Sequence, residues 1–201
     1  MKLIGMLDSP YVRRVAISAK RLGLTLDHDP VSVFRHFERF QQINPVVKAP
    51  TLVLDDGEVL IDSTLILDYL EALSAKTLLP SDLSQRSKAL RLIGLGLAAC
   101  EKAVQLYYER NLRPAEIQYQ PWVERVESQL AAAFTALEHE LSQQPLPTDG
   151  SLAQDGITLA VAWSFTGLVV PDQISAERFP HIAQYTAYAE SLEAFTSTPM
   201  N

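Results

Sequence analysis

The sequence predicts an α/β domain followed by an all-α domain, because strand and helix patterns occur in different parts of the chain. Short apolar runs typical of strands are confined to the first 75 residues: 2–5 (KLIG), 51–54 (TLVL) and 58–61 (EVLI). Beyond that point the strand signals stop, and apolar residues recur at helical spacing. A chain of 201 residues is long enough for two small domains, each with its own core.

The first domain is predicted to follow the order β-α-β-α-β-β-α. Its first helix, residues 10–22, begins with Ser9 at a capping position and a proline at the first helical position. The turn at residues 55–57 (DDG) lies between two apolar runs, which predicts a β-hairpin. A weaker strand is expected over residues 24–29, and the last helix of the domain over 63–75.

The remainder of the chain is predicted to be helical. Helical patterns cover residues 85–112, 116–142, 156–170 and 180–195. The most apolar stretch, residues 157–170, has only fourteen residues. A membrane span needs about 20 apolar residues, so we predict a buried helix there and no contact with a membrane. The predicted domain boundaries are 1–75 for the first domain, 76–84 for a linker and 85–201 for the helical domain.

The composition excludes several functional classes. Apolar residues make up 47% of the chain and charged residues 20%, which is typical of a folded globular protein. The net charge of −7 argues against a nucleic-acid partner. The single cysteine, Cys100, can form neither an internal disulfide nor a thiolate cluster, so we predict a reduced, cytoplasmic protein with an inert buried thiol. The four histidines lack metal-ligand spacing, and we expect no metal site.

Three local features carry possible chemistry, and the first is Ser9 at the start of a helix. One interpretation is a plain cap, in which the hydroxyl accepts a hydrogen bond from the helix backbone. The other is an anion site, in which the hydroxyl donates to a bound anion while the helix dipole adds a favourable field.

The second feature is the pair Ala49-Pro50 immediately before a predicted strand. The frequency of cis bonds before proline, about 5–6%, favours a trans proline that simply opens the strand. A cis bond would instead turn the backbone of Ala49 outward. Its N–H and C=O groups could then pair with an extended peptide, as in strand addition.

The third feature is the pair Asp62-Ser63 between a predicted strand and a predicted helix. Either side chain could cap that helix. Alternatively, Ser63 and the helix N-terminus could hold a carboxylate while Asp62 holds an ammonium group. Such a pair would recognise the two charged groups of an amino acid.

The three features occur in the order and spacing of a known family. The stretches concerned are residues 9–15 (SPYVRRV), 44–52 (NPVVKAPTL), 55–57 (DDG) and 61–70 (IDSTLILDYL). With them the sequence resembles the cytosolic glutathione transferases, whose first domain is thioredoxin-like and whose second domain is all-helical. The resemblance covers the whole chain, and its specific motifs lie in the first 75 residues.

The resemblance implies a role for each matched residue toward glutathione as co-substrate. Ser9 would face the sulfur, with Tyr11 as the alternative donor. Ala49, before a cis Pro50, would pair through its backbone with the cysteinyl part.

The two ends of glutathione would be held by other residues. Lys48 would reach the glycyl end, and Asp62 and Ser63 would bind the γ-glutamyl amino and carboxylate groups. The family resemblance also implies a homodimer.

The sequence departs from the family pattern at three positions. Val47 stands where glycine is usual, and Asp62 stands where glutamate is more common. In the helical domain, Val161 replaces the aspartate that usually follows a Ser or Thr cap, so Thr158 would cap the helix without a reciprocal partner.

We therefore predict a glutathione transferase that conjugates glutathione to a small apolar electrophile. Tyr11, Tyr107, Tyr108 and Arg110 are the candidate electrophile-side residues, although a tyrosine cluster at helical spacing is more often part of a core. One alternative is a non-catalytic binding module with the same fold. A glutaredoxin-type oxidoreductase is disfavoured, because position 9 is serine and no C-x-x-C motif occurs in the sequence.

Overall fold

The structure is a computed structural model, and it describes residues 1–200. It divides into two compact units. The first contains residues 1–78 together with the chain from Leu192 onward, and the second contains residues 79–191. The predicted division had assigned the whole C-terminal end to the helical domain. The difference arises because Phe195 is fully buried and the backbone carbonyl of Thr198 accepts a hydrogen bond from Arg13 Nε at 2.9 Å.

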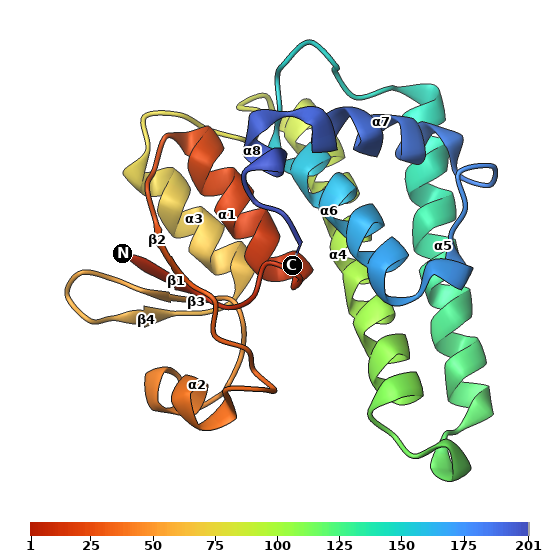
Figure 1. Ribbon diagram of the computed structural model, residues 1–201. Coiled ribbons are helices and arrows are strands. Elements are labelled where there is room, and N and C mark those ends of the chain that lie inside the picture. The colour runs from red at the N-terminus through yellow and green to blue at the C-terminus, as the bar shows by residue number, and fades with distance from the viewer. Residues whose placement is uncertain (201) are drawn as a thin grey trace. The chain divides into compact units, whose positions relative to one another are not determined.

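The first unit has the predicted element order, with one mixed sheet (Figure 1). Within residues 1–200 the strands are β1 (Lys2–Ile4), β2 (Asp27–Asp29), β3 (Thr51–Val53) and β4 (Val59–Leu60). They lie in the order β2-β1-β3-β4. β1 and β2 are parallel, whereas β1 with β3 and β3 with β4 are antiparallel. The thioredoxin-like prediction is therefore confirmed.

Helices cover both faces of this sheet. They are α1 (Pro10–Leu22), α2 (Phe37–Ile43) and α3 (Ser63–Leu73). The unit also contains the short α8 (Glu193–Thr196), which packs against α1. α1 and α3 lie side by side (Figure 1). On α2, Phe40 packs in a buried cluster with Ile4 and Val31. Successive residues of a strand point to opposite faces of the sheet. The side chains of Leu3 and Ile4 in β1 are therefore buried on opposite faces.

α1 has the boundaries that the sequence predicts, because both of its ends carry local signals. Pro10 occupies the first helical position, where a missing N–H costs nothing. Gly23 ends the helix in the left-handed conformation with φ of 79°, which glycine adopts without a steric penalty. Val12 and Val15 are fully buried on the helix face that packs inward.

The second unit is a helical bundle, as predicted. Its elements are α4 (Leu83–Asn111), the turn η1 (Ala115–Ile117), α5 (Gln120–Gln143), α6 (Gln154–Val169), the turn η2 (Pro171–Gln173) and α7 (Pro180–Ser191). The rings of Phe134, Trp163 and Phe179 meet in its core, with centroids 5.6–6.1 Å apart. Cys100 is buried at 2% exposure, which confirms that part of the prediction. Within residues 1–200, no helix combines the length and the apolar character needed to cross a bilayer.

The predicted cap of α6 is wrong. The helix begins at Gln154, so Thr158 lies one turn inside it. The Thr158 hydroxyl donates to the Gln154 carbonyl at 2.7 Å. The Thr158 methyl group lies beside Gly96 of α4, where an added Cβ would be 3.1 Å from it. A side chain within the helix cannot accept from the first N–H groups, which are the ones that a cap satisfies. The N-cap residue is Ala153, which makes no side-chain cap hydrogen bond.

Ala153→Ser is therefore expected to stabilise the protein by roughly 0.5–1 kcal/mol. Ala153 is exposed and already has the extended backbone of an N-cap, with φ of −99° and ψ of 173°, so a serine hydroxyl can accept from the second or third helical N–H. The measurement is urea unfolding, with Ala153→Val as the control that cannot accept a hydrogen bond. Equal midpoints for the serine and valine variants would contradict the prediction.

Candidate functional site

The three features found in the sequence lie at one end of the sheet. β1 runs toward this end and leads to Ser9, and Ile4 at the end of β1 pairs with Thr51 at the start of β3. Ala49-Pro50 therefore lies beside the chain that leaves β1. β4 runs antiparallel to β3 and ends at Leu60, which pairs with Leu52. Asp62-Ser63 follows β4 at this same end.

Ser9 is the N-cap residue of α1, but its side chain does not cap the helix. The backbone has φ of −71° and ψ of 124°, and the hydroxyl makes no capping hydrogen bond. The Ser9 carbonyl accepts from Arg13 N–H at 2.9 Å, as a helix start requires. Of the two interpretations of Ser9, side-chain capping is therefore wrong. The half-buried hydroxyl lies at the positive end of a thirteen-residue helix.

The Ala49-Pro50 peptide bond is cis, which confirms the expectation drawn from the family resemblance rather than the one drawn from proline statistics. Ala49 lies against the chain that follows β1. A Cβ placed on Gly5 would be 3.1 Å from Ala49 Cβ, so the absence of a side chain at residue 5 permits this approach. Pro50 is buried, and Lys48 is exposed.

A buried polar network shapes the loop before Pro50. Asn44, which is 4% exposed, donates from Nδ2 to Thr51 Oγ1 at 2.9 Å and accepts from Val46 N–H at 3.0 Å. The Thr51 hydroxyl in turn donates to the Lys48 carbonyl at 2.8 Å. Val47, where the family usually has glycine, has φ of 51°, in the left-handed region that disfavours a β-branched residue. The network holds the loop in this conformation despite the valine.

Asp62 is the N-cap of α3 and uses one oxygen for that purpose. Its Oδ1 accepts from Thr64 N–H at 2.9 Å and from Leu65 N–H at 3.3 Å. The capping interpretation is thus correct for Asp62. Because both of these bonds go to Oδ1, Oδ2 keeps its lone pairs for a cationic group.

Ser63 is buried at 3% exposure in the first turn of α3. Its oxygen accepts a hydrogen bond from Arg14 Nη1 at 3.2 Å. Since this bond occupies an acceptor site, the hydroxyl hydrogen of Ser63 can donate to a carboxylate at the positive end of α3.

Arg14 is a residue of the site that the sequence reasoning did not identify. It is 2% exposed on α1, and its guanidinium also donates to Thr64 Oγ1 at 3.4 Å. It therefore places a positive charge behind the N-terminus of α3. The available signal was a pair of adjacent arginines, Arg13 and Arg14, between apolar residues of an amphipathic helix. A buried charge has to be hydrogen-bonded, which points to a positioning role.

A carboxylate precedes Ser9 along the chain. Burial raises the pKa of Asp8 above its ordinary value, and the charge of Arg35 partly opposes this shift.

The comparisons with known proteins agree with this geometry. Residues 3–77 match the family described as the N-terminal domain of glutathione S-transferases. The chain is 30% identical over 198 residues to glutathione S-transferase theta-2 of Rattus norvegicus, covering 96% of this chain and 80% of that protein. The chain belongs to the glutathione transferase family.

Two further relatives extend the similarity over the full length. The chain is 28% identical over 200 residues to the uncharacterized GST-like protein YibF of Escherichia coli strain K12, covering 98% of each. A glutathione transferase family member from Pseudomonas fluorescens Pf-5, solved with bound glutathione, matches with a TM-score of 0.87 at 26% identity. That match covers 100% of this chain and 98% of the other.

The residues predicted to contact the electrophile do not all belong to the same unit. Tyr11 is half-buried in the first turn of α1, in the first unit. Tyr107 and Tyr108 are near the end of α4 in the second unit, with ring centroids 6.2 Å apart. Tyr108 is 41% exposed, and burial of the rest of the ring raises the pKa of its phenol.

Arg110 forms ion pairs with two carboxylates of the second unit. Its guanidinium donates to both oxygens of Asp172 at 3.0 and 3.1 Å and to Glu127 at 2.7 Å. These hydrogen bonds raise the pKa of Arg110 and lower that of Asp172. The ion pairs connect α4, α5 and η2, so the charge of Arg110 is already compensated within the second unit.

No metal site is apparent in the described part of the chain. Residues 1–200 contain no group of three or more His, Cys, Asp or Glu side chains arranged to hold an ion.

Proposed function

We propose that this protein is a glutathione transferase that binds glutathione at the end of the sheet where Ser9, Ala49-Pro50 and Asp62-Ser63 meet. The observation that carries the proposal is the convergence of these three segments, together with a Ser9 hydroxyl that does not cap its helix. Support comes from the Pseudomonas fluorescens relative, which carries glutathione and matches the whole chain.

The residues at this end of the sheet fit the parts of glutathione. The backbone of Ala49, ahead of the cis bond, suits pairing with the cysteinyl unit, as a strand edge pairs with a peptide. Asp62 Oδ2 and the Ser63 hydroxyl suit the ammonium and carboxylate of the γ-glutamyl unit. Exposed Lys48 supplies a flexible cation for the glycyl carboxylate.

Ser9 and the N-terminus of α1 favour the thiolate form of the bound sulfur. A free cysteine thiol has a pKa of about 8.5, so only a few per cent is ionised at neutral pH. Lowering this pKa by about two units requires about 2.7 kcal/mol of preferential stabilisation. One hydrogen bond to a charged acceptor contributes roughly 1.5–3 kcal/mol, and the helix dipole roughly 0.3–1 kcal/mol more. The chemistry that glutathione supplies is nucleophilic attack by its sulfur on an electrophilic carbon.

We extend the proposal to a small apolar electrophile as the second substrate. Tyr107 and Tyr108 of α4 are the residues we assign to it, because they offer partly exposed aromatic surface. We propose Tyr11 of α1 separately, as the alternative donor to the sulfur. Arg110 is a weaker candidate, since two carboxylates already hold it. We place the activity in the cytoplasm, where the buried thiol of Cys100 stays reduced.

The experiment that tests the proposed function is ultraviolet difference absorption of bound glutathione near neutral pH. A thiolate band upon binding is the expected result. Binding measured by calorimetry without that band would overturn the transferase proposal in favour of the non-catalytic binding module.

Asp62→Asn is expected to raise the KM for glutathione severalfold with little change in kcat. The residue would contact the γ-glutamyl end, where interactions are similar in the ground and transition states, and such uniform binding changes KM. The asparagine oxygen can still accept from Thr64 N–H, so helix α3 keeps its cap. Steady-state kinetics with varied glutathione makes the measurement. A collapse of kcat at unchanged KM would contradict the assignment of Asp62 to binding the γ-glutamyl end of glutathione.

We also propose that the protein is a homodimer, as the family resemblance implies. Multi-angle light scattering is expected to give a mass twice the 22.3 kDa of the chain at concentrations well above micromolar. A mass equal to one chain under these conditions would show that the proposal is wrong.

A further inference from the structure

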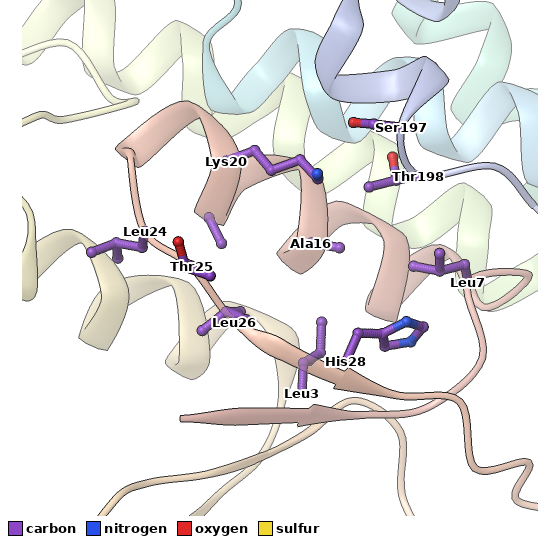
Figure 2. A pocket seen from close by; sticks show the side chains of 11 residues that line it. Leu3, Leu7, Ala16, Lys20, Leu24, Thr25, Leu26, His28, Ser197 and Thr198 are labelled. Carbon is purple, nitrogen blue, oxygen red and sulfur yellow. The ribbon is translucent and has the colours of Figure 1, made fainter.

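A hollow of about 240 Å³ lies in the first unit, along α1 (Figure 2). Its walls come from the C-terminal half of α1, from Ser197 and Thr198 after α8, and from β1, β2 and the segments beside them, namely Leu3, Leu7, Leu24, Thr25, Leu26 and His28. Ala16 and Lys20 lie about 10 Å and 16 Å along the helix from Ser9, at about 1.5 Å per residue. On α1 the hollow therefore lies away from Ser9, while Leu7, two residues before Ser9, also lines it.

Small residues on α1 create this space. Ala16 and Ala19 are three positions apart and share one helix face, where longer side chains would fill the hollow. The remaining apolar lining is made of leucines, namely Leu3, Leu7, Leu24 and Leu26. The floor is thus apolar and narrow. Its volume lies just below the range of about 300–1,000 Å³ that is typical of ligand pockets, so it suits a ligand with a single ring.

The polar atoms at the rim carry one positive charge. Lys20 is the cation among the lining side chains, its ammonium reaches toward Ser197 and Thr198 (Figure 2), and none of the lining residues is acidic. The hydroxyls of Ser197 and Thr198 already donate to the carbonyls of Glu193 and Ala194, at 2.6 and 2.8 Å. They can accept further hydrogen bonds but not donate them.

The histidine in the wall is held in one orientation. His28 Nε2 lies 2.8 Å from the Gly5 carbonyl, which can only accept, so this nitrogen carries the hydrogen. The two acids that flank His28 on β2 lie near other cations: the Asp27 carboxylate is 3.6 Å from Lys2 Nζ, and the Asp29 carboxylate is 2.7 Å from Arg39 Nη2. Lys20 is therefore the group in the hollow that can neutralise an anion.

We propose that this hollow binds a small apolar monocarboxylate, with its ring against Ala16 and Ala19 and its carboxylate beside Lys20. An apolar body with one anionic group matches the apolar floor and the single cation at the rim. The ligand would contact both α1 and the segment after α8, which Arg13 already joins through its hydrogen bond to the Thr198 carbonyl. This inference does not depend on the proposed transferase function.

The test is a titration of the full-length protein with phenylacetate, followed by amide chemical shifts in NMR. Saturable shifts are expected at residues 16–20, 24–28 and 197–198. The uncharged analogue phenylacetamide is expected to bind about fivefold more weakly, because it lacks the charge that pairs with Lys20. Saturating glutathione is expected to leave the phenylacetate shifts in place.

Variants assign the binding to the hollow. Lys20→Met is expected to weaken phenylacetate about fivefold and to leave phenylacetamide unchanged, since the methionine keeps the apolar stem. Ala16→Leu should abolish both by filling the space. Lys88→Met, which removes an exposed lysine from the second unit, is the matched control and should change neither.

Three results would overturn the proposal. The first is shifts centred on residues 9–12, 49–51 and 62–64 that glutathione displaces, which would place the carboxylate in the glutathione site. The second is equal affinity for the acid and the amide. The third is shifts that do not saturate, which would indicate weak contact over the whole surface. None of these would alter the thiolate test of the transferase proposal.

Discussion

Ser9→Ala is expected to raise the pKa of the bound glutathione thiol by about one to two units and to slow conjugation about ten- to a hundredfold near neutral pH. The substitution removes a hydrogen bond to a charged acceptor, worth roughly 1.5–3 kcal/mol. Each 1.36 kcal/mol corresponds to about one pKa unit and about one decade in rate. Stability should change little, because the Ser9 hydroxyl makes no capping hydrogen bond.

The pH dependence separates loss of thiolate from other defects. A raised thiol pKa shifts the pH–rate profile of Ser9→Ala to higher pH, so the difference from the parent should shrink as the pH rises. Titration of the thiolate absorption in the parent, Ser9→Ala and Tyr11→Phe makes the assignment. An unchanged pKa in Ser9→Ala with a raised one in Tyr11→Phe would move the role to Tyr11. No shift in either variant would leave the transferase proposal without its mechanism.

Gly156→Ala is expected to destabilise the protein by about 1–3 kcal/mol or more, through overpacking in the second unit. A Cβ at this position on α6 would overlap the hydroxyl of Tyr185 and lie 2.8 Å from its Cζ atom. Tyr185 is 5% exposed on α7, so its rigid ring cannot swing into solvent without leaving the core. Urea unfolding of the full chain measures the loss.

A second substitution tests the cause. In the background Tyr185→Phe, where the hydroxyl is absent, Gly156→Ala should cost at least about 1 kcal/mol less, as a coupling between residues in contact. The matched control is Gly94→Ala in the interior of α4, where an added Cβ meets nothing within 4 Å. That change should stabilise by roughly 0.5–1 kcal/mol. Equal effects of Gly156→Ala in both backgrounds would show that Tyr185 is not the obstacle.

Local signals in the sequence were enough for the order of the elements and for the ends of α1. Pro10 at the first helical turn and Gly23 after the last one restrict the backbone by themselves, whatever packs around them. The hairpin at residues 55–57 follows in the same way from an Asp-Gly turn. The three site segments could be found because they occur at strand and helix ends, where motifs are read from neighbouring residues.

The hydrogen-bond partners of the site residues were decided by tertiary structure. Asp62 caps its helix and Ser9 does not, although both precede a helix in the sequence. Arg14 reaches Ser63, 49 positions away, because α1 packs beside α3.

The C-terminal end of the chain was likewise decided by tertiary structure. The sequence predicts one helix over residues 180–195, but the helix is interrupted between α7 and α8 because the backbone of Leu192 is extended. Beyond this break the side chain of Phe195 is buried in the first unit. Periodicity along one segment indicates which face of a helix is apolar. It does not indicate which distant surface that face will bury against, because that choice depends on contacts made only when the whole chain is folded.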